Sequence, residues 1–176
     1  MSVLTSASAA IARRGTTASA LSAAAAALII IASLATAQHL LGLAVFALPF
    51  VASAALIALA PSGPPARPGA ILRAYPAAAA AALPITAVLG PSEAAVAASV
   101  VATVALMAIL RAPHIPAALC AGGIGLTGPG LGYLPHTLIP AVAIVLVAAW
   151  VAGGSCLASS TRCAGDTGRH TMEVRP

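Results

Sequence analysis

Residues 111–128 read RAPHIPAALCAGGIGLTG, which places an arginine, a histidine and two prolines ahead of a glycine-rich run. Pro113 and Pro116 are close enough to interrupt a helix, and Pro116 suits the first turn of a new one. A helix N-terminus offers free N–H groups and a partial positive charge, so together with Arg111 and His114 it favours an anion. We therefore predict a broken helix whose start forms the cytoplasmic side of an anion pathway.

A plainer interpretation of the same residues needs no ligand. Arg111 would reach from a helix end to the lipid headgroups, and His114 would lie at the same interface. His114 is nevertheless the main group here that titrates near neutral pH. If the chain transports a solute, we expect transport to change between about pH 5.5 and 7.5 through His114.

A second proline-marked segment, PFVASAAL, begins at Pro49. Pro49 is expected to interrupt its apolar segment, either as an ordinary kink of a membrane helix or as part of a binding site. Ser53 lies one helical turn later, where interhelical packing is the plainer role. The predicted substrate-binding residues are Arg111, His114, Pro116, Pro49 and Ser53.

Enzymatic chemistry has little support in the sequence. An intramembrane enzyme would need a nucleophile with a base, paired carboxylates or a set of metal ligands. Glu93 is the only acidic residue before the C-terminal tail, and no histidine or cysteine recurs at a metal-ligand spacing. The GIGLTG run at 123–128 matches a dinucleotide-binding pattern, but no strand precedes it. We expect no enzyme, no metal and no cofactor.

The composition indicates a protein of the lipid bilayer. Apolar residues make up 61% of the chain and charged residues only 6%, against roughly 25% charged in a soluble domain. The formal net charge is +5, but the basic residues are all arginines with few aromatic residues between them, unlike a nucleic-acid-binding face. The expected partners are therefore lipid and a small anion, with no nucleic acid.

The apolar segments predict an all-α, polytopic bundle of transmembrane helices with proline-broken elements. A polar leader over 1–18 and a polar, disordered tail over 154–176 flank a bundle over 19–153. Within "GPSE", Ser92 is placed as the N-cap of a helix that begins at Glu93. The six expected membrane elements lie at about 19–38, 40–60, 70–89, 93–110, 114–132 and 136–154.

The arginines predict the orientation of these elements. If all six cross the membrane, every arginine falls on the side of the two termini, which the positive-inside rule makes cytoplasmic. Re-entrant elements at 40–60 or 114–132 would move some arginines to the outer face, so a multi-pass protein of the cell membrane with six crossings fits best. Tyr75 and Trp150 would then mark the inner interface, and Tyr133 the outer one.

Three further expectations concern the bundle as a whole. The order of unbroken and proline-broken elements is similar in the two halves, which suggests a 3+3 inverted repeat. The glycine-rich residues 122–132 should face the interior, because irregular backbone at membrane depth needs polar partners. As an alternative to an anchor, the first apolar segment ends in ATAQ, which fits signal-peptide cleavage after Ala37.

The segments LPFVASAALIALAPSGPPARP and ALMAILRAPHIPAALCAGG together resemble the HPP family of integral membrane proteins over about residues 40–152. Arg111, His114 and Pro116 match its namesake His-Pro-Pro stretch, with Ile115 in place of the first proline. Pro49 and Ser53 match its Pro-Phe-Gly-Ala-Ser-Ala segment, in which this chain has valine for glycine. Where the family pattern has Gly-Gly-His, this chain has Arg-Ala-Tyr at 73–75.

The resemblance also carries expectations about topology and substrate. Family members are generally described with about four spanning helices, which agrees with an even count but not with six crossings. Some members are associated with nitrite transport in plastids and cyanobacteria. The resemblance thus implies a transporter or channel for a small anion such as nitrite, with a non-transporting scaffold or assembly subunit as the alternative.

Overall fold

The computed structural model describes the backbone of residues 2–42 and 44–166 and the side chains of residues 19–42 and 44–153. Every regular element in these residues is helical, as predicted. In chain order the elements are α1 (Ser2–Leu41), α2 (Leu48–Leu59), η1 (Pro64–Ala66), α3 (Pro68–Leu89), α4 (Glu93–Ile109), α5 (Ile115–Thr127), η2 (Leu134–Leu138) and α6 (Ile139–Asp166).

The apolar helices fall into two length classes. Within the described residues, Ser19–Leu41, Pro68–Leu89 and Leu134–Gly153 are long and apolar enough to cross a membrane. The other three, α2, α4 and α5, have 12, 17 and 13 residues. At about 1.5 Å per residue, α2 and α5 are only about 20 Å long or less, against a hydrocarbon core of about 30 Å. Three long helices are therefore combined with three short ones.

The two elements predicted over 40–60 and 114–132 are shorter than expected because of prolines and glycines. Pro49 lies in the first turn of α2 and so begins this helix rather than breaking it, which corrects the prediction. In the chain before it, Gly42 and residues 44–47 are not helical. By contrast, Pro76 and Pro84 both lie inside the uninterrupted helix α3. At the C-terminal end of α5, Gly128 takes a left-handed conformation that ends the helix.

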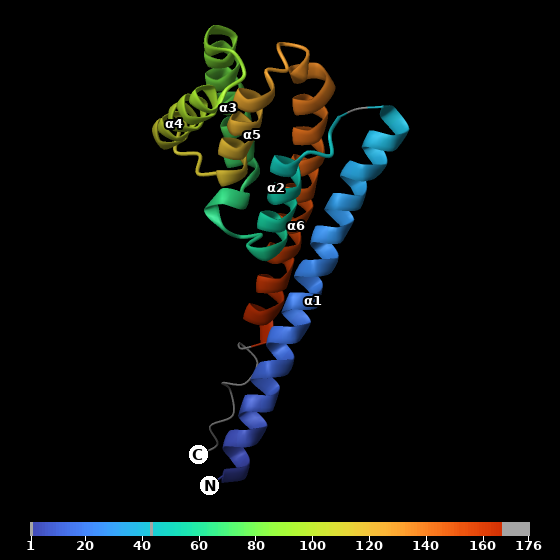
Figure 1. The fold of residues 1–176 in the computed structure, drawn as a ribbon. Helices are drawn as coiled ribbons and strands as arrows, with labels where there is room; N and C mark the ends of the chain where they lie inside the picture. Colours follow the sequence, from blue (N-terminus) through green and yellow to red (C-terminus); the bar gives the residue numbers. More distant parts are fainter. Residues whose placement is uncertain (1, 43, 167–176) are drawn as a thin grey trace.

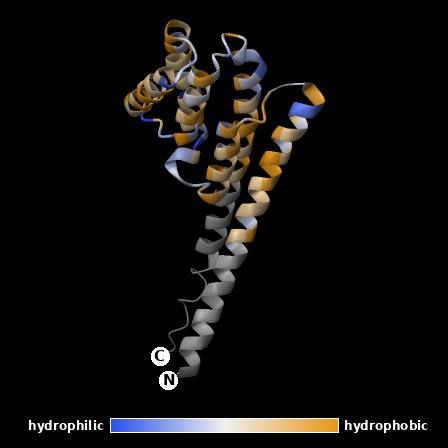
Figure 2. Ribbon diagram, viewed as in Figure 1, coloured by the Kyte–Doolittle hydropathy of each residue, from blue (hydrophilic) through white to orange (hydrophobic). Residues whose placement is uncertain are grey.

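Successive helices alternate in direction along the bundle (Figure 1). The α2–α3 and α4–α5 connections therefore lie towards the end where α1 begins and α6 finishes, and the other connections lie at the opposite end. Arg67, Arg73 and Arg111 all belong to the first end, whereas Glu93 belongs to the opposite one. The hydrophilic residues gather at helix ends and connections (Figure 2). This arrangement agrees with the predicted grouping of the arginines on one side.

The helices pack as two groups that do not coincide with the halves of the sequence. Helices α3, α4 and α5 pack most extensively against one another, and α1, α2 and α6 form the second group. A Cβ atom on Gly125 of α5 would lie 2.8 Å from the backbone of Val96 in α4, so only glycine permits this close approach. Neither group consists of the three helices of one sequence half, so the packing gives no support to the predicted 3+3 inverted repeat. The repeat stays a prediction.

The glycine-rich residues 122–132 only partly face the interior. Gly125 is buried and Gly122 packs against Val100, but Leu126 and the residues from Thr127 to Gly132 are exposed. The prediction is wrong for this second part because α5 ends at Thr127 and the chain turns through Gly128 and Gly130, both at positive φ. The glycines provide close packing of two helices followed by a turn.

Several smaller expectations can be placed on the structure. Ser92 caps α4 as predicted, its hydroxyl accepting a hydrogen bond of 3.2 Å from the Ala95 N–H. Helix α1 includes most of the predicted leader, and α6 continues past the predicted boundary at 153 to Asp166. The disorder predicted for the tail falls, over 167–176, outside the described residues. Ile30 and Leu34 of α1 are buried in the core, and cleavage after Ala37 stays an open alternative.

Candidate functional site

Three polar side chains meet inside the bundle, where α2, α3 and the start of α5 come together. Ser53 lies in the second turn of α2, Tyr75 lies in α3, and His114 is the residue immediately before α5. All three have 0% exposed surface, in a core that otherwise consists mostly of alanine and branched aliphatic residues. We call Ser53, Tyr75 and His114 the polar cluster.

Hydrogen bonds join the three helices through this cluster. Ser53 Oγ lies 2.7 Å from Tyr75 Oη and 3.0 Å from His114 Nε2. His114 Nδ1 lies 2.8 Å from the carbonyl oxygen of Pro65, in η1. Both hydroxyls also lie 3.1 Å from the carbonyl oxygen of Pro49. Ser53 is thus the central member, with a partner on each side.

These distances fix the histidine tautomer of the neutral state. A carbonyl oxygen can only accept a hydrogen bond, so Nδ1 carries the proton and donates to Pro65. Nε2 is then an acceptor and receives the Ser53 hydroxyl, whose oxygen in turn accepts from Tyr75. Every polar atom of the neutral cluster has a partner.

Aromatic packing holds the cluster in place. The rings of Phe50 and Tyr75 stack with their centroids 5.3 Å apart, and the Tyr75 and His114 rings are tilted at the same separation. Phe50 is fully buried, and Pro116 is buried in the first turn of α5. Pro49 and Pro116 both lie in the first turn of a helix. They therefore fix where α2, which carries Ser53, and α5, which follows His114, begin.

The structure brings together four of the five predicted site residues, but Arg111 is not among them. Arg111 is exposed, with φ of 49°, directly after the end of α4. The N–H groups of Arg111 and Ala112 bond back to the carbonyls of Ala108 and Met107, which is the Schellman arrangement of a helix end. From there exposed and buried residues alternate as far as Pro116, so Arg111 and His114 face opposite sides.

The expected combination of arginine, imidazole and helix N-terminus is therefore not formed around one point. Arg111 instead joins Arg67 and Arg73, which are also exposed at this end of the bundle. Arg73 donates hydrogen bonds to the carbonyls of Gly69 and Leu110, at 2.8 and 3.1 Å, and so ties α3 to the end of α4. We call Arg67, Arg73 and Arg111 the arginine rim.

Tyr75 is the residue of the cluster that the sequence analysis missed. It was expected at the inner membrane interface, but it is fully buried and its hydroxyl is bonded within the bundle. The prediction is wrong because Tyr75 lies on the face of α3 that carries the buried Ile71, Ala74, Ala78 and Ala82. A signal was present, since Tyr75 stands where the family pattern has a histidine. Trp150, in contrast, is 76% exposed, and its place at the inner interface stays a prediction.

A second pair of polar groups lies further along α5. Cys120 Sγ is 3.2 Å from Tyr133 Oη, just before η2. Cys120 is buried and Tyr133 half-buried, so Tyr133 is partly inside the bundle as well as near its predicted interface. Cys120 is six positions after His114, or about 9 Å along the helix axis. Interior polar groups thus follow α5 from its start towards the opposite end of the bundle.

Ser99 and Thr103 form a contrasting pair on α4. They were expected to be interhelical packing residues, and both have 0% exposed surface on the face that also carries Ala95 and Met107. Neither hydroxyl has a hydrogen-bond partner among the described residues.

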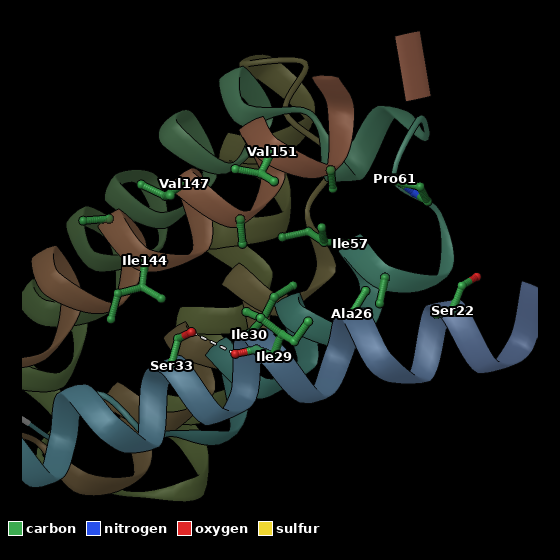
Figure 3. Close-up of a pocket in the computed structure, with 15 residues that line it drawn as sticks. Ser22, Ala26, Ile29, Ile30, Ser33, Ile57, Pro61, Ile144, Val147 and Val151 are labelled. Carbon is green, nitrogen blue, oxygen red and sulfur yellow. Dashed lines mark hydrogen bonds between the residues drawn. The ribbon is translucent and has the colours of Figure 1, made fainter. Parts of the chain in front are cut away.

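A cavity lies away from the polar cluster, between α1, α2 and α6 (Figure 3). It has a volume of about 960 Å³ and is lined mainly by aliphatic side chains, among them Ile29, Ile57, Ile144 and Val147. The Ser33 hydroxyl at its wall donates to the Ile29 carbonyl of its own helix at 2.8 Å. This cavity offers apolar surface and no convergent polar groups. Among the described residues no three His, Cys, Asp or Glu side chains gather in a way that would hold a metal.

Comparison with known proteins places the chain in a family. The family model described as "HPP, transmembrane region" matches residues 12–156, a longer stretch than the 40–152 over which the sequence resemblance was noted. No match was found to a curated protein or to a solved structure. The match covers α2 to α5 in full, most of α1 and α6, and the whole polar cluster. The chain therefore belongs to the HPP family of integral membrane proteins.

Proposed function

We propose that this protein is a membrane carrier for a small monovalent anion, with the polar cluster as its central site. The observation that carries the proposal is that Ser53, Tyr75 and His114 converge from three different helices in an apolar interior. Polar and ionisable side chains within a membrane bundle are costly, and they commonly mark the path of a solute or a proton. We expect no enzymatic activity, and we propose the cell membrane as its location.

The charges at one end of the bundle favour an anion as the solute. Arg67, Arg73 and Arg111 are exposed there, next to the connections that contribute Pro65 and His114 to the cluster. No acidic side chain is described at this end, since Glu93 begins α4 at the opposite one. Clustered positive charge raises the local concentration of anions and speeds their arrival. Nitrite, nitrate and formate share the required charge and small size, and the family resemblance favours nitrite.

The described state supports a carrier rather than an open pore. All three side chains of the cluster are fully buried, and their hydrogen bonds are satisfied by one another and by the Pro49 and Pro65 carbonyls. An anion entering the site would replace part of this network, with the Ser53 and Tyr75 hydroxyls and the imidazole N–H as its donors. Such exchange requires the start of α5 to move relative to α2 and α3, which is the movement expected of a carrier.

The alternative is a scaffold or assembly subunit that moves no solute. One observation favours it: the cluster is complete without a ligand and connects α2, α3 and α5, so it can act purely as an interhelical fastener. The two roles differ in what a substitution changes. A fastener contributes stability alone, whereas a carrier site contributes flux at unchanged abundance.

The test is flux in proteoliposomes that contain the purified full chain, measured with nitrite, nitrate and formate and normalised to inserted protein. We expect flux of at least one anion above that of protein-free vesicles. His114→Gln and Ser53→Ala should reduce it at least about tenfold, the effect of losing an interaction of roughly 1.4 kcal/mol in the transport step. Thr86→Val is the matched control, since the Thr86 hydroxyl is buried in α3 but bonds only to Ala82 of its own helix.

Two results would reject the proposal. One is wild-type protein that inserts and folds but moves none of the three anions. The other is full flux in both cluster variants. Loss of folded protein in the cluster variants, with no flux in the wild type, would instead support the fastener.

A further inference from the structure

The hydrogen bonds of the polar cluster form a chain with two complete arrangements. In the neutral arrangement, the Tyr75 hydroxyl donates to Ser53, the Ser53 hydroxyl donates to His114 Nε2, and Nδ1 donates to the Pro65 carbonyl. Either oxygen of the 2.7 Å Ser53–Tyr75 contact can be the donor, so this direction is not the only one that the geometry permits.

The reverse arrangement accommodates one additional proton. With a proton on Nε2, the imidazolium donates to Ser53 Oγ over 3.0 Å, and Ser53 donates to Tyr75 Oη over 2.7 Å. Tyr75 then donates to the Pro49 carbonyl over 3.1 Å, and Nδ1 still donates to Pro65. No donor or acceptor of the cluster loses its partner, because the Pro49 carbonyl receives the last hydroxyl in the chain.

A proton can reach Nε2 by passing along this chain. A proton that arrives at Tyr75 Oη displaces the hydroxyl proton of Tyr75 to Ser53 Oγ, and the Ser53 proton moves to Nε2. Each oxygen ends with one hydrogen, as it began, and the cluster gains one positive charge, which is carried by His114. The proton comes from water or from the protonated solute, and no redox partner is required.

We propose that Ser53, Tyr75 and His114 are the proton-binding site of the carrier, so that the anion moves together with one proton. This inference rests on the function proposed above and names its co-substrate. The combined movement of an anion and a proton transfers no net charge. An uncoupled anion would be driven out of a negative-inside cell, and coupling removes that barrier to uptake.

The surroundings leave His114 as the proton carrier. From α3 it faces Tyr75, and from α2 it faces Ser53, neither of which becomes charged near neutral pH. The charged groups of the neighbouring elements are Arg67, Arg73 and Arg111, all exposed at the rim. Cys120, the next titratable group along α5, bonds to Tyr133 rather than to the cluster. No described carboxylate contacts this region to serve instead.

The first test separates coupled from uncoupled flux, with nitrite as the probe and protein-free vesicles for the background. A pH difference of about one unit at zero potential should accumulate nitrite about tenfold. A potential of about 100 mV without a pH difference, which would shift an uncoupled anion about 50-fold, should accumulate none. Tyr75→Phe keeps the ring and removes the relay hydroxyl, so it should lose the pH-driven accumulation, while Thr86→Val in the same helix keeps it. Accumulation that follows the potential and ignores the pH difference would overturn the coupling while leaving the carrier intact.

The second test is independent of flux. Nitrogen-15-labelled histidine in the micelle-bound full chain is titrated from pH 8 to pH 4, with the His114 signals assigned by their loss in His114→Gln. We expect His114 to take up a proton reversibly while the fold is kept, and Ser53→Ala to make protonation harder because the proton on Nε2 then has no acceptor. A His114 that stays neutral to pH 4, or whose protonation coincides with unfolding, would overturn the site. If the wild type moves no anion, the proposed function and the coupling both fail, and this titration alone decides whether the proton site exists.

Discussion

Two pairs of buried hydroxyl groups in this bundle differ sharply in their surroundings. Ser53 and Tyr75 on α2 and α3 are linked to each other, to His114 and to backbone carbonyls. Ser99 and Thr103 on α4 are equally buried but have no hydrogen-bond partner among the described residues. Burial alone therefore does not distinguish a site from a packing surface. The distinguishing feature is the convergence of polar groups from several helices, and the predictions below test this contrast from the largest effect to the smallest.

The largest effect is expected from His114→Ala. The substitution removes both histidine hydrogen bonds and leaves a cavity, so it should lower the free energy of unfolding by about 2–4 kcal/mol and abolish flux. Thermal unfolding in micelles and flux in proteoliposomes measure the two effects. His114→Gln, which retains volume and polarity, separates them, since it should recover most of the stability but not the flux. Recovery of both would contradict a role for the imidazole.

A smaller effect is expected from Tyr75→Phe. Loss of the hydroxyl removes the 2.7 Å bond to Ser53 but keeps the stacking on Phe50, so the cost should be about 1–2 kcal/mol. Combined with Ser53→Ala it should cost less than the sum of the single substitutions, with a coupling of at least about 0.5 kcal/mol. Additive costs would show that the two hydroxyls do not interact, against the geometry described here.

Thr103→Val is expected to act in the opposite direction. It replaces an unpartnered buried hydroxyl by a methyl group of similar shape, so the free energy of unfolding should stay the same or rise by up to about 1 kcal/mol. Flux and its pH dependence should not change. A clear loss of stability or flux would mean that Thr103 has a polar partner in the membrane, and that the contrast between the two pairs is smaller than the structure indicates.

The smallest effect is expected from Arg111→Gly. Arg111 has φ of 49° at the end of α4, a conformation that glycine adopts without strain, so this substitution should raise the free energy of unfolding by up to about 1 kcal/mol. Since the side chain lies on the rim, flux should fall only modestly, and the fall should disappear at high salt. A loss of flux as large as that expected for His114→Gln would show that Arg111 acts at the polar cluster itself.

The sequence was sufficient to predict the apolar helical bundle, the cap at Ser92 and two of the three members of the cluster. It also predicted Pro116 in the first turn of a new helix, but not how the other prolines act. Pro49 and Pro116 begin helices, whereas Pro76 and Pro84 lie inside α3, because proline is tolerated at both kinds of position in membrane helices.

The orientation of Arg111 and the burial of Tyr75 were beyond the reach of sequence patterns for a different reason. Arg111 points outward because the helix-end turn and the extended residues after it set the alternation of exposed and buried positions. Tyr75 turns inward because of the register of α3 against α2, which the alanine-rich sequence of α3 does not specify. In both cases the tertiary arrangement decides which of two plausible sides a residue faces.

The most direct test of the central claim compares matched variants of the two hydroxyl pairs in one flux assay. Wild type, Tyr75→Phe and Thr103→Val are reconstituted at equal amounts of folded protein, and nitrite entry is measured with the acid side outside. If the polar cluster is the site, Tyr75→Phe loses at least about tenfold in pH-driven entry, the loss that corresponds to one hydrogen bond of about 1.4 kcal/mol, and Thr103→Val matches the wild type. Equal entry by all three proteins would contradict the assignment of function to the cluster.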